Sequence, residues 1–301
     1  MPFLLLPASG AFAFGRGMAY LCLAMTIDVS FLKPVLKVRE NVSHKGDYGH
    51  LLIVAGCQTM PGAAVLSTGA ALQSGCGLVT LHSTERALQA AVVSFPSAML
   101  SENAGACFDR VPDRIGRYSA IAAGPGLGQA PETSEALGNL MDVAREAGIP
   151  MVLDADALNL LASRPSLLDR LPAGSVLTPH LGELRRLLPQ PTEEKICALS
   201  RQTGCVIIVK GYRSKVYTPE GECHVNTTGN PGMAKGGSGD VLTGLVGGLL
   251  ARGYSAGEAA CMGAWIHGYA GDCLTQRRTA EAYSSRDLID CLYEGFAALF
   301  V

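Results

Sequence analysis

Short apolar runs alternate with longer helix-like stretches along most of the chain from about residue 50. The runs predict strands at 51–55, 77–81, 120–123, 150–153, 175–178 and 205–209. They are apolar throughout rather than at every second position, which is typical of strands buried on both faces of a parallel sheet. Helical patterns fill the segments between them. The alternation predicts an α/β fold, a doubly wound and mostly parallel sheet with helices on both faces.

The last third of the chain changes pattern. Two short extended pieces, near 215–217 and 223–225, are close enough to predict a hairpin-like pair at an edge of the sheet. Three helices are then expected at 238–251, 256–273 and 285–299. No low-complexity linker and no internal repeat divides the chain, so residues 41–301 are expected to form a single domain.

Residues 1–40 are set apart as an N-terminal extension of uncertain status. Residues 1–24 are rich in Leu, Ala, Phe and Gly, but glycines interrupt the apolar run, so no membrane span is expected there. Three alternatives stay open: a secretory signal with 11–13 near its cleavage site, a disordered extension, or a start assigned too far upstream. In the last case Met18 or Met25 would be the initiator.

Composition and charge narrow the classes of protein to which this chain can belong. Hydrophobic residues make up 48% and charged residues 17%, which excludes intrinsic disorder. Basic side chains number 24 and acidic ones 26, so the chain has no basic excess to bind nucleic acid, and no membrane partner is expected either. The ten cysteines lack zinc spacing and mostly lie in apolar runs, which favours buried, reduced thiols in a cytoplasmic protein.

The most informative segment is 230–240, which leads straight into an apolar helical pattern. Its glycines, Gly236, Gly237 and Gly239, let backbone N–H groups converge at a helix N-terminus, which is an anion site suited to a phosphate. Asp240 stands at the mouth of that helix. It could take a proton from an attacking hydroxyl during phosphoryl transfer, or it could simply cap the helix. Spacing alone does not separate these two interpretations.

Other candidates follow the ends of predicted strands, where sheets of this class bind ligands. Gly124–Gly128 lacks the dinucleotide fingerprint spacing but permits a close approach of the backbone to a ligand, unless it is a plain turn. Asp154 is expected to orient a ligand or metal, whereas Asp156 is expected to cap the next helix.

Two further strand ends carry polar side chains. His180 and Glu183 would share one face of a helical turn, and the strand-end location favours ligand contact by His180 over a buried or capping role. Glu183 is a candidate to hold Mg²⁺ through water. Lys210 is a candidate phosphate or nucleotide contact.

Taken in order, these pieces resemble one known family, the ADP- or ATP-dependent NAD(P)H-hydrate dehydratases. The resemblance covers roughly residues 40–300 and rests on 45–50, 62–64, 71–72 with 75–79, 124–128, 154–159, 178–183, 210–211 and 230–240. It implies a ribokinase-like fold. It also implies a reaction in which a nucleotide phosphorylates the ring hydroxyl of the S epimer of hydrated NADH or NADPH, and phosphate then leaves to restore NAD(P)H.

The resemblance also implies a role for each matched residue. Asp240 would be the base, with Gly237 and Gly239 in the anion hole, and Glu183 would serve Mg²⁺. The hydrate would be contacted by Ala64, Gly126, His180 and Asp240. The nucleotide, ADP or ATP, would be held by Lys210, Gly211, Tyr212, Arg213, Ser214, Asn230, Gly232, Met233, Ala234, Gly236, Gly237, Ser238 and Gly239. By analogy the protein would be a homo-oligomer, a tetramer.

The sequence departs from the family pattern at the nucleotide loop. Tyr212 stands where a small residue is expected and Ser214 where Thr is expected, so the preference between ADP and ATP stays open. One alternative function is a kinase for vitamin-precursor alcohols with the same fold. A second is a nucleotide-binding regulatory protein without catalysis, against which the retained Asp240 argues.

Overall fold

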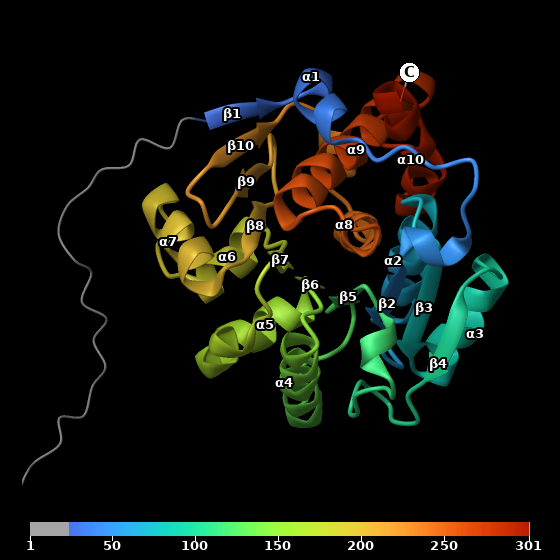
Figure 1. Ribbon diagram of the computed structural model, residues 1–301, viewed down its shortest axis with the longest axis vertical. Coiled ribbons are helices and arrows are strands. Elements are labelled where there is room, and N and C mark those ends of the chain that lie inside the picture. The colour runs from blue at the N-terminus through green and yellow to red at the C-terminus, as the bar shows by residue number, and fades with distance from the viewer. Residues whose placement is uncertain (1–23, 301) are drawn as a thin grey trace, which may run out of the picture.

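A single ten-stranded sheet runs through the computed structural model, which describes residues 24–300 (Figure 1). The strand order is β1-β10-β9-β8-β7-β6-β5-β2-β3-β4. Neighbouring strands are parallel, except that β9 runs antiparallel to both β8 and β10. The strands are β1 Ala24–Ile27, β2 His50–Val54, β3 Leu78–Ser83, β4 Met99–Glu102, β5 Ala120–Ala123, β6 Met151–Leu153, β7 Val176–Leu177, β8 Val206–Val209, β9 Lys215–Tyr217 and β10 Cys223–Asn226.

Helices cover both faces of this sheet, so the predicted doubly wound α/β architecture is confirmed. One face carries α2 Pro61–Gln73, α3 Glu85–Ser94, α8 Ser238–Ala251, α9 Ala256–Arg277 and α10 Ser285–Phe300. The other carries α4 Pro131–Glu146, α5 Asp156–Ser163, α6 Leu181–Leu187 and α7 Glu193–Thr203. The short helices are α1 Val29–Leu32, η1 Lys33–Val35, η2 Lys45–Tyr48, η3 Ile115–Arg117, η4 Pro165–Arg170 and η5 Pro231–Met233.

Strand β2 shows why the strands are apolar at every position. Leu51 and Ile53 belong to the core beneath α2 and α8, whereas Leu52 and Val54 belong to the core beneath α4 and α5. All four side chains are fully buried. Successive side chains of a strand point to opposite faces, so a strand that is covered twice has no polar face.

The edge of the sheet differs from the expectation. Strands β9 and β10 pair as predicted, but β10 also pairs with β1, so the hairpin is not the edge. Strand β1 lies within the segment that the sequence analysis set apart as an extension. A four-residue strand has too short a pattern to be recognised beside the Gly-rich residues before it. The alternatives for residues 1–24 concern positions that lie almost wholly outside the described residues.

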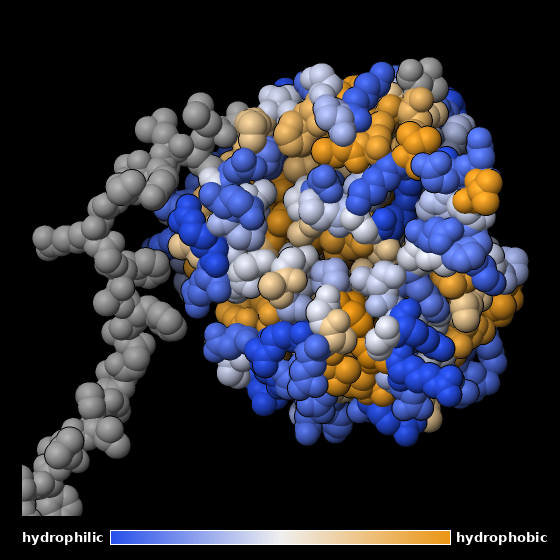
Figure 2. All heavy atoms as spheres, in the orientation of Figure 1, coloured by the Kyte–Doolittle hydropathy of each residue, from blue (hydrophilic) through white to orange (hydrophobic). Residues whose placement is uncertain are grey.

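The cysteines lie mostly in the interior, as their apolar sequence surroundings predicted. Eight of the nine cysteines within residues 24–300 are buried, and Cys107 is half-buried. Figure 2 shows hydrophobic side chains gathered over α9 and α10 on a face that is otherwise mixed. Within the described part of the chain, no helix combines the length and the apolar character that crossing a membrane requires.

Candidate functional site

A cavity of about 730 Å³ lies beyond the carboxyl ends of β6, β7 and β8. These strand ends supply Asp154, His180 and Lys210 to its wall. The segment after β10 and the first turn of α8 close the other side. The topology therefore brings together candidates that lie up to about 90 residues apart in the sequence, at the sheet end where such folds bind ligands.

The N-terminus of α8 is shaped by glycine. Gly237 is the N-cap and has a φ of 90°, and a β-carbon there would lie 2.4 Å from Leu66, so no larger residue fits. Gly239 faces the Lys210 ammonium, which would lie 3.2 Å from an added β-carbon. Asp240 is the third residue of the helix rather than its N-cap. The capping interpretation of Asp240 is therefore wrong.

Asp240 is half-buried and lines the cavity. Burial raises the pKa of its carboxyl group to about 6, and the nearby Asp154 and Asp156 carboxylates push in the same direction while Lys210 opposes them. A carboxylate with a pKa near neutrality can take a proton and is still mostly ionised at pH 7. These are the properties of a general base.

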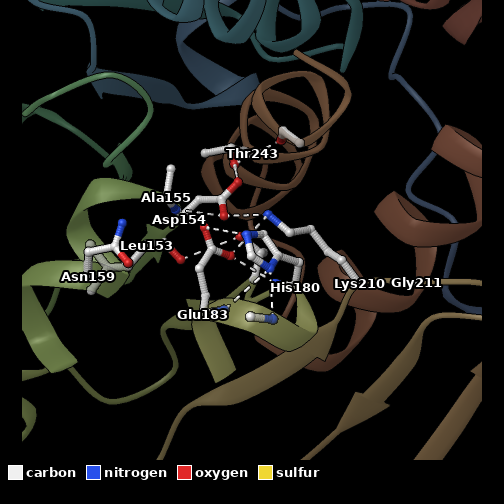
Figure 3. Close-up of polar contacts among 12 residues, drawn as sticks. Leu153, Asp154, Ala155, Asn159, His180, Glu183, Lys210, Gly211 and Thr243 are labelled. Atoms are coloured by element: carbon white, nitrogen blue, oxygen red, sulfur yellow. Dashed lines mark hydrogen bonds and ion pairs between the residues drawn. The ribbon is translucent and has the colours of Figure 1, made fainter. Parts of the chain in front are cut away.

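Asp154 has the opposite character, because its carboxylate is fully paired (Figure 3). Its Oδ1 accepts hydrogen bonds from Lys210 Nζ at 2.6 Å and from the Ala155 amide at 2.8 Å. Its Oδ2 accepts from Thr243 Oγ1 at 2.7 Å. The side chain is 1% exposed. The sequence analysis missed Thr243, which lies in an apolar helix and shows its role only when α8 packs over β6.

Lys210 links this carboxylate to a second one. Its Nζ lies 3.8 Å from Glu183 Oε2 and forms an ion pair with Asp154. Strand β8 continues past its last residue through a bridge between Lys210 and His180, which holds the two side by side. The predicted contact between Lys210 and a phosphate stays a prediction. To bind a phosphate, the Lys210 ammonium would have to contact it while keeping its ion pair with Asp154.

His180 combines two of the interpretations considered for it. It is the N-cap of α6, where its Nδ1 accepts hydrogen bonds from the amides of Gly182 and Glu183 at 2.9 and 3.3 Å. Because Nδ1 acts as an acceptor, the proton of the neutral ring is on Nε2, which lies 3.4 Å from Glu183 Oε1. The ring is half exposed and also lines the cavity. Capping thus fixes the orientation in which the ring faces the cavity.

Glu183 does not offer open metal-binding oxygens. Its Oε2 accepts from the His180 amide at 2.9 Å and faces Lys210, and its Oε1 faces the His180 ring. Within residues 24–300 no three His, Cys, Asp or Glu side chains form a group that could hold a metal ion. The residues therefore fit a Mg²⁺ ion bound mainly by phosphate oxygens and waters, with Glu183 reached through water. That contact stays a prediction.

Asn230 begins the segment predicted to hold a nucleotide, and its side chain fixes the shape of that segment. Its Oδ1 accepts from the Gly232 amide and from Tyr283 Oη, both at 3.0 Å. Its Nδ2 donates to Asp272 Oδ1 at 3.0 Å, and Asp272 Oδ2 accepts from the Gly229 amide. The sequence analysis missed Asp272 and Tyr283, which lie in or beside the C-terminal helices.

The loop after β8 forms the mouth of the cavity. Ser214 Oγ accepts from the Gly211 amide and can donate to the Gly211 carbonyl, at 3.3 and 3.1 Å, which closes a tight turn. Arg213 has a φ of 53°, in the left-handed region. Tyr212 is 83% exposed and lines the cavity with its neighbours. An exposed aromatic ring there can stack on a base.

A buried histidine forms a hydrogen bond with the backbone at the start of α8. His267 of α9 donates from Nε2 to the Ser238 carbonyl at 2.9 Å. Burial lowers the pKa of His267 to about 4, so the ring is neutral at pH 7. This residue was also missed, because a single His in an apolar helix carries no sequence signal of its own.

Several predicted residues lie outside this cavity. Ala64 is fully buried inside α2, and Gly126 packs against Met60 and Ala63 at the start of that helix. Gly232 and Gly236 line a neighbouring cavity of about 500 Å³. The predicted residues that line the main cavity are Lys210, Gly211, Tyr212, Arg213, Ser214, Asn230, Met233, Ala234, Ser238, Gly239, Asp240, His180 and Glu183.

Asp156 requires a correction. Ala155 is the N-cap of α5, and Asp156 is the first residue of the helix and makes no capping bond. Its carboxylate instead accepts from the Gly128 amide at 2.9 Å and from Gln129 Nε2 at 2.8 Å. It thereby holds the Gly124–Gly128 turn, whose glycines Gly124, Gly126 and Gly128 all have positive φ.

Sequence comparison identifies relatives of the whole region. The profile of the NAD(P)H-hydrate dehydratase family matches residues 51–294. An ADP-dependent (S)-NAD(P)H-hydrate dehydratase of Neisseria meningitidis is 38% identical over 80% of this chain and 82% of its own length. A bifunctional NAD(P)H-hydrate repair enzyme of Moorella thermoacetica is 36% identical over 88% of this chain, which spans only 52% of that longer protein.

Solved structures agree with these relatives. An ADP/ATP-dependent NAD(P)H-hydrate dehydratase from Bacillus subtilis, co-crystallised with ATP and Mg²⁺, superposes with a TM-score of 0.81 and 29% identity over 92% of this chain and 99% of its own. A ribokinase-like superfamily protein from Enterococcus faecalis has a TM-score of 0.79 at 24% identity over 95% of this chain. The second likeness confirms the ribokinase-like fold.

Proposed function

This chain belongs to the NAD(P)H-hydrate dehydratase family, and from that premise we propose that it restores NADH and NADPH from their S hydrates at the expense of ADP or ATP. The observation that carries the proposal is Asp240, an ionisable carboxylate without a hydrogen-bond partner among the described residues, beside the glycine N-terminus of α8. A protein that only bound nucleotide would not need such a group.

The reaction takes place in two stages at this cavity. Asp240 accepts the proton of the substrate ring hydroxyl, and the hydroxyl oxygen then attacks the terminal phosphorus of the nucleotide. The bond to the nucleotide's bridging oxygen breaks, which leaves AMP from ADP or ADP from ATP. Phosphate, a better leaving group than hydroxide, then departs from the ring carbon with the bonding electron pair. Loss of a proton from the adjoining carbon restores the double bond.

The chain's own groups stabilise the charge that develops. The amides at the start of α8, around Gly237 and Gly239, would bind the transferred phosphoryl group, because the N-terminus of a helix and its dipole favour negative charge. The Lys210 ammonium, next to Gly239, adds a positive charge. Bound Mg²⁺ would neutralise further phosphate charge, with Glu183 orienting one of its waters.

One assay tests the proposal directly. Absorbance at 340 nm is followed on hydrated NADH and hydrated NADPH with ADP, ATP or no nucleotide, each with Mg²⁺. A nucleotide-dependent rise, with the faster nucleotide identified as the donor, is the expected result. Phosphorylation of a vitamin-precursor alcohol without any rise at 340 nm would replace the proposal by the kinase alternative. A tetrameric assembly and a cytoplasmic location remain predictions, and light scattering tests the first.

A further inference from the structure

A second cavity, of about 450 Å³, opens at the far side of the sheet, next to β3 and β4. Its floor includes His82 and Ser101, which are paired across these two strands. Three arginines of the connection between β4 and β5, namely Arg110, Arg114 and Arg117, line its wall. The proposed reaction assigns no role to any of these side chains.

Two of the arginines are available to a ligand. Within residues 24–300, Arg110 and Arg114 make no hydrogen bond or ion pair through their side chains, although Glu102 and Asp113 line the same cavity. Both arginines are exposed. Arg117 differs, because it donates to the Tyr118 hydroxyl and lies over that ring. A guanidinium group binds the oxygens of phosphate in a bidentate manner, and two unpaired groups can do so together.

His82 supplies an independent sign of a ligand. The side chain is 4% exposed, and its Nδ1 lies 3.0 Å from Ser101 Oγ, yet its Nε2 has no hydrogen-bond partner among the described residues. Burial lowers the pKa of His82, so the ring is neutral at pH 7. When Nδ1 accepts from the serine hydroxyl, Nε2–H is a buried donor that faces the arginine cavity. The backbone carbonyl of Arg110 lies near the ring and partly offsets the lowering of its pKa, but it makes no hydrogen bond that satisfies Nε2, so this buried donor is left for an acceptor from a ligand.

The cavity lies within reach of the proposed reaction centre. The sheet order from the main cavity outward is β6, β5, β2, β3, and three strand spacings amount to about 14 Å. The loops are in contact along this route: Gly126 packs on Met60, and the Gln58 amide, two residues before Met60, donates to the carbonyl of Ala106 at 3.1 Å. In an extended dinucleotide a 2′-phosphate on the adenosine ribose lies at about this distance from the nicotinamide ring, whereas the pyrophosphate is closer to it.

We propose that Arg110, Arg114 and His82 bind a phosphate group of the substrate dinucleotide, at the end away from the ring that reacts at Asp240. This inference rests on the proposed function. The arginines provide charge and bidentate donors, and His82 provides a neutral N–H donor. If the bound group is the 2′-phosphate of NADPH, the cavity favours the hydrate of NADPH over that of NADH. If it is the pyrophosphate, both hydrates benefit equally.

The test compares R110A/R114A with a matched control, R164A/R185A, which removes two exposed arginines outside both cavities. Affinities for NADPH and NADH are measured by the fluorescence of the reduced ring, with ADP and Mg²⁺ present. We expect R110A/R114A to raise the NADPH dissociation constant about tenfold or more, as the loss of charge-assisted hydrogen bonds does. A rise for NADPH alone identifies the 2′-phosphate, and an equal rise for both identifies the pyrophosphate.

Inorganic phosphate separates a substrate subsite from a simple anion site. In the wild-type protein, phosphate should compete with NADPH and shift the His82 Nε2 resonance. A shift of that resonance without any effect of R110A/R114A on either dinucleotide would overturn the proposal and leave a free-phosphate site. Affinities equal to those of the control, with normal turnover of both hydrates, would overturn it as well. If the wild-type protein neither bound nor repaired either dinucleotide, the proposed function itself would fall.

Discussion

Asp154 and Asp240 are two carboxylates of one cavity with opposite surroundings. Asp154 is 1% exposed and accepts from an ammonium, an amide and a hydroxyl. Asp240 is half-buried, lacks a hydrogen-bond partner among the described residues, and its pKa is raised to about 6. The same chemical group thus has three hydrogen-bond donors in one place and none in the other. The donors around a carboxylate, rather than its residue type, decide whether it is free to take a proton.

The largest expected effect comes from removing Asp240, the carboxylate proposed as the base. Asp240→Asn keeps the shape of the side chain but cannot accept a proton, so kcat for dehydration should fall about 10³-fold, within the range for loss of a general base. Nucleotide affinity, measured by calorimetry, should stay near wild type. Asp290→Asn, an exposed carboxylate of α10, is the matched control. Near-normal turnover of Asp240→Asn would show that Asp240 is not the base.

The paired carboxylate should matter for stability. Asp154→Asn leaves the partly buried Lys210 ammonium without its main counter-charge, and the free energy of unfolding should fall by about 3 kcal/mol, the loss that follows from breaking a buried pair. Urea unfolding measures it. The double variant D154N/K210M removes both charges and should recover part of the loss. A single variant as stable as wild type would mean that Asp154 is not held as the structure implies.

Replacing Asp240 should raise the free energy of unfolding, whereas replacing Asp154 lowers it, and the gain should appear only at high pH. The pKa of Asp240 is about 6 in the folded protein, against an ordinary value of 3.8 for Asp, so the folded state holds the proton more tightly. Stability from this group is present below about pH 4 and is lost as the pH rises through 6. At pH 8 the free energy of unfolding of Asp240→Asn should therefore exceed that of wild type by about 3 kcal/mol, and at pH 4 the two should be equal. Equal stability at both pH values would contradict the raised pKa.

Sequence pattern predicted the elements that are buried on both sides better than those at the margins. Strands such as β2 are apolar throughout because two layers of helices cover them, and this pattern is local and visible. Strand β1 and the bridge beyond β8 depend on which segments the fold places side by side, and a pattern of three or four residues cannot show this.

The residues of the candidate site fall into the same two groups: those that a local pattern reveals and those that only the fold brings together. Residues in short motifs, such as Asp240 in the glycine segment and His180 and Lys210 after strand ends, could be found from spacing and from the family resemblance. Thr243, His267 and Asp272 could not, because each lies in a helix and reaches the site only through tertiary packing. Asp156 was assigned to a cap because helix starts favour Asp, but its partners lie 27 and 28 residues earlier in the sequence.

The smallest expected effect concerns segment 230–240, which is predicted to hold a nucleotide. It shows whether hydrogen bonds hold this segment as firmly as they hold Asp154. Tyr283→Phe removes only the hydroxyl that donates to Asn230 Oδ1 at 3.0 Å, and this oxygen still accepts from the Gly232 amide. The free energy of unfolding should fall by about 1 kcal/mol, the usual net value of one hydrogen bond. Nucleotide affinity should fall a few-fold, because the segment loses one of its fixed contacts.

Tyr293→Phe is the control for this comparison, because Tyr293 is exposed, its Oη donates to the neighbouring Glu294, and it lies outside the cavities. It should leave both quantities near wild type. If Tyr283→Phe instead abolished nucleotide binding while stability barely changed, the hydroxyl would touch the ligand itself. The Asn230 network would then belong with Asp240, among the groups kept available for chemistry, and not with Asp154, whose donors hold it still.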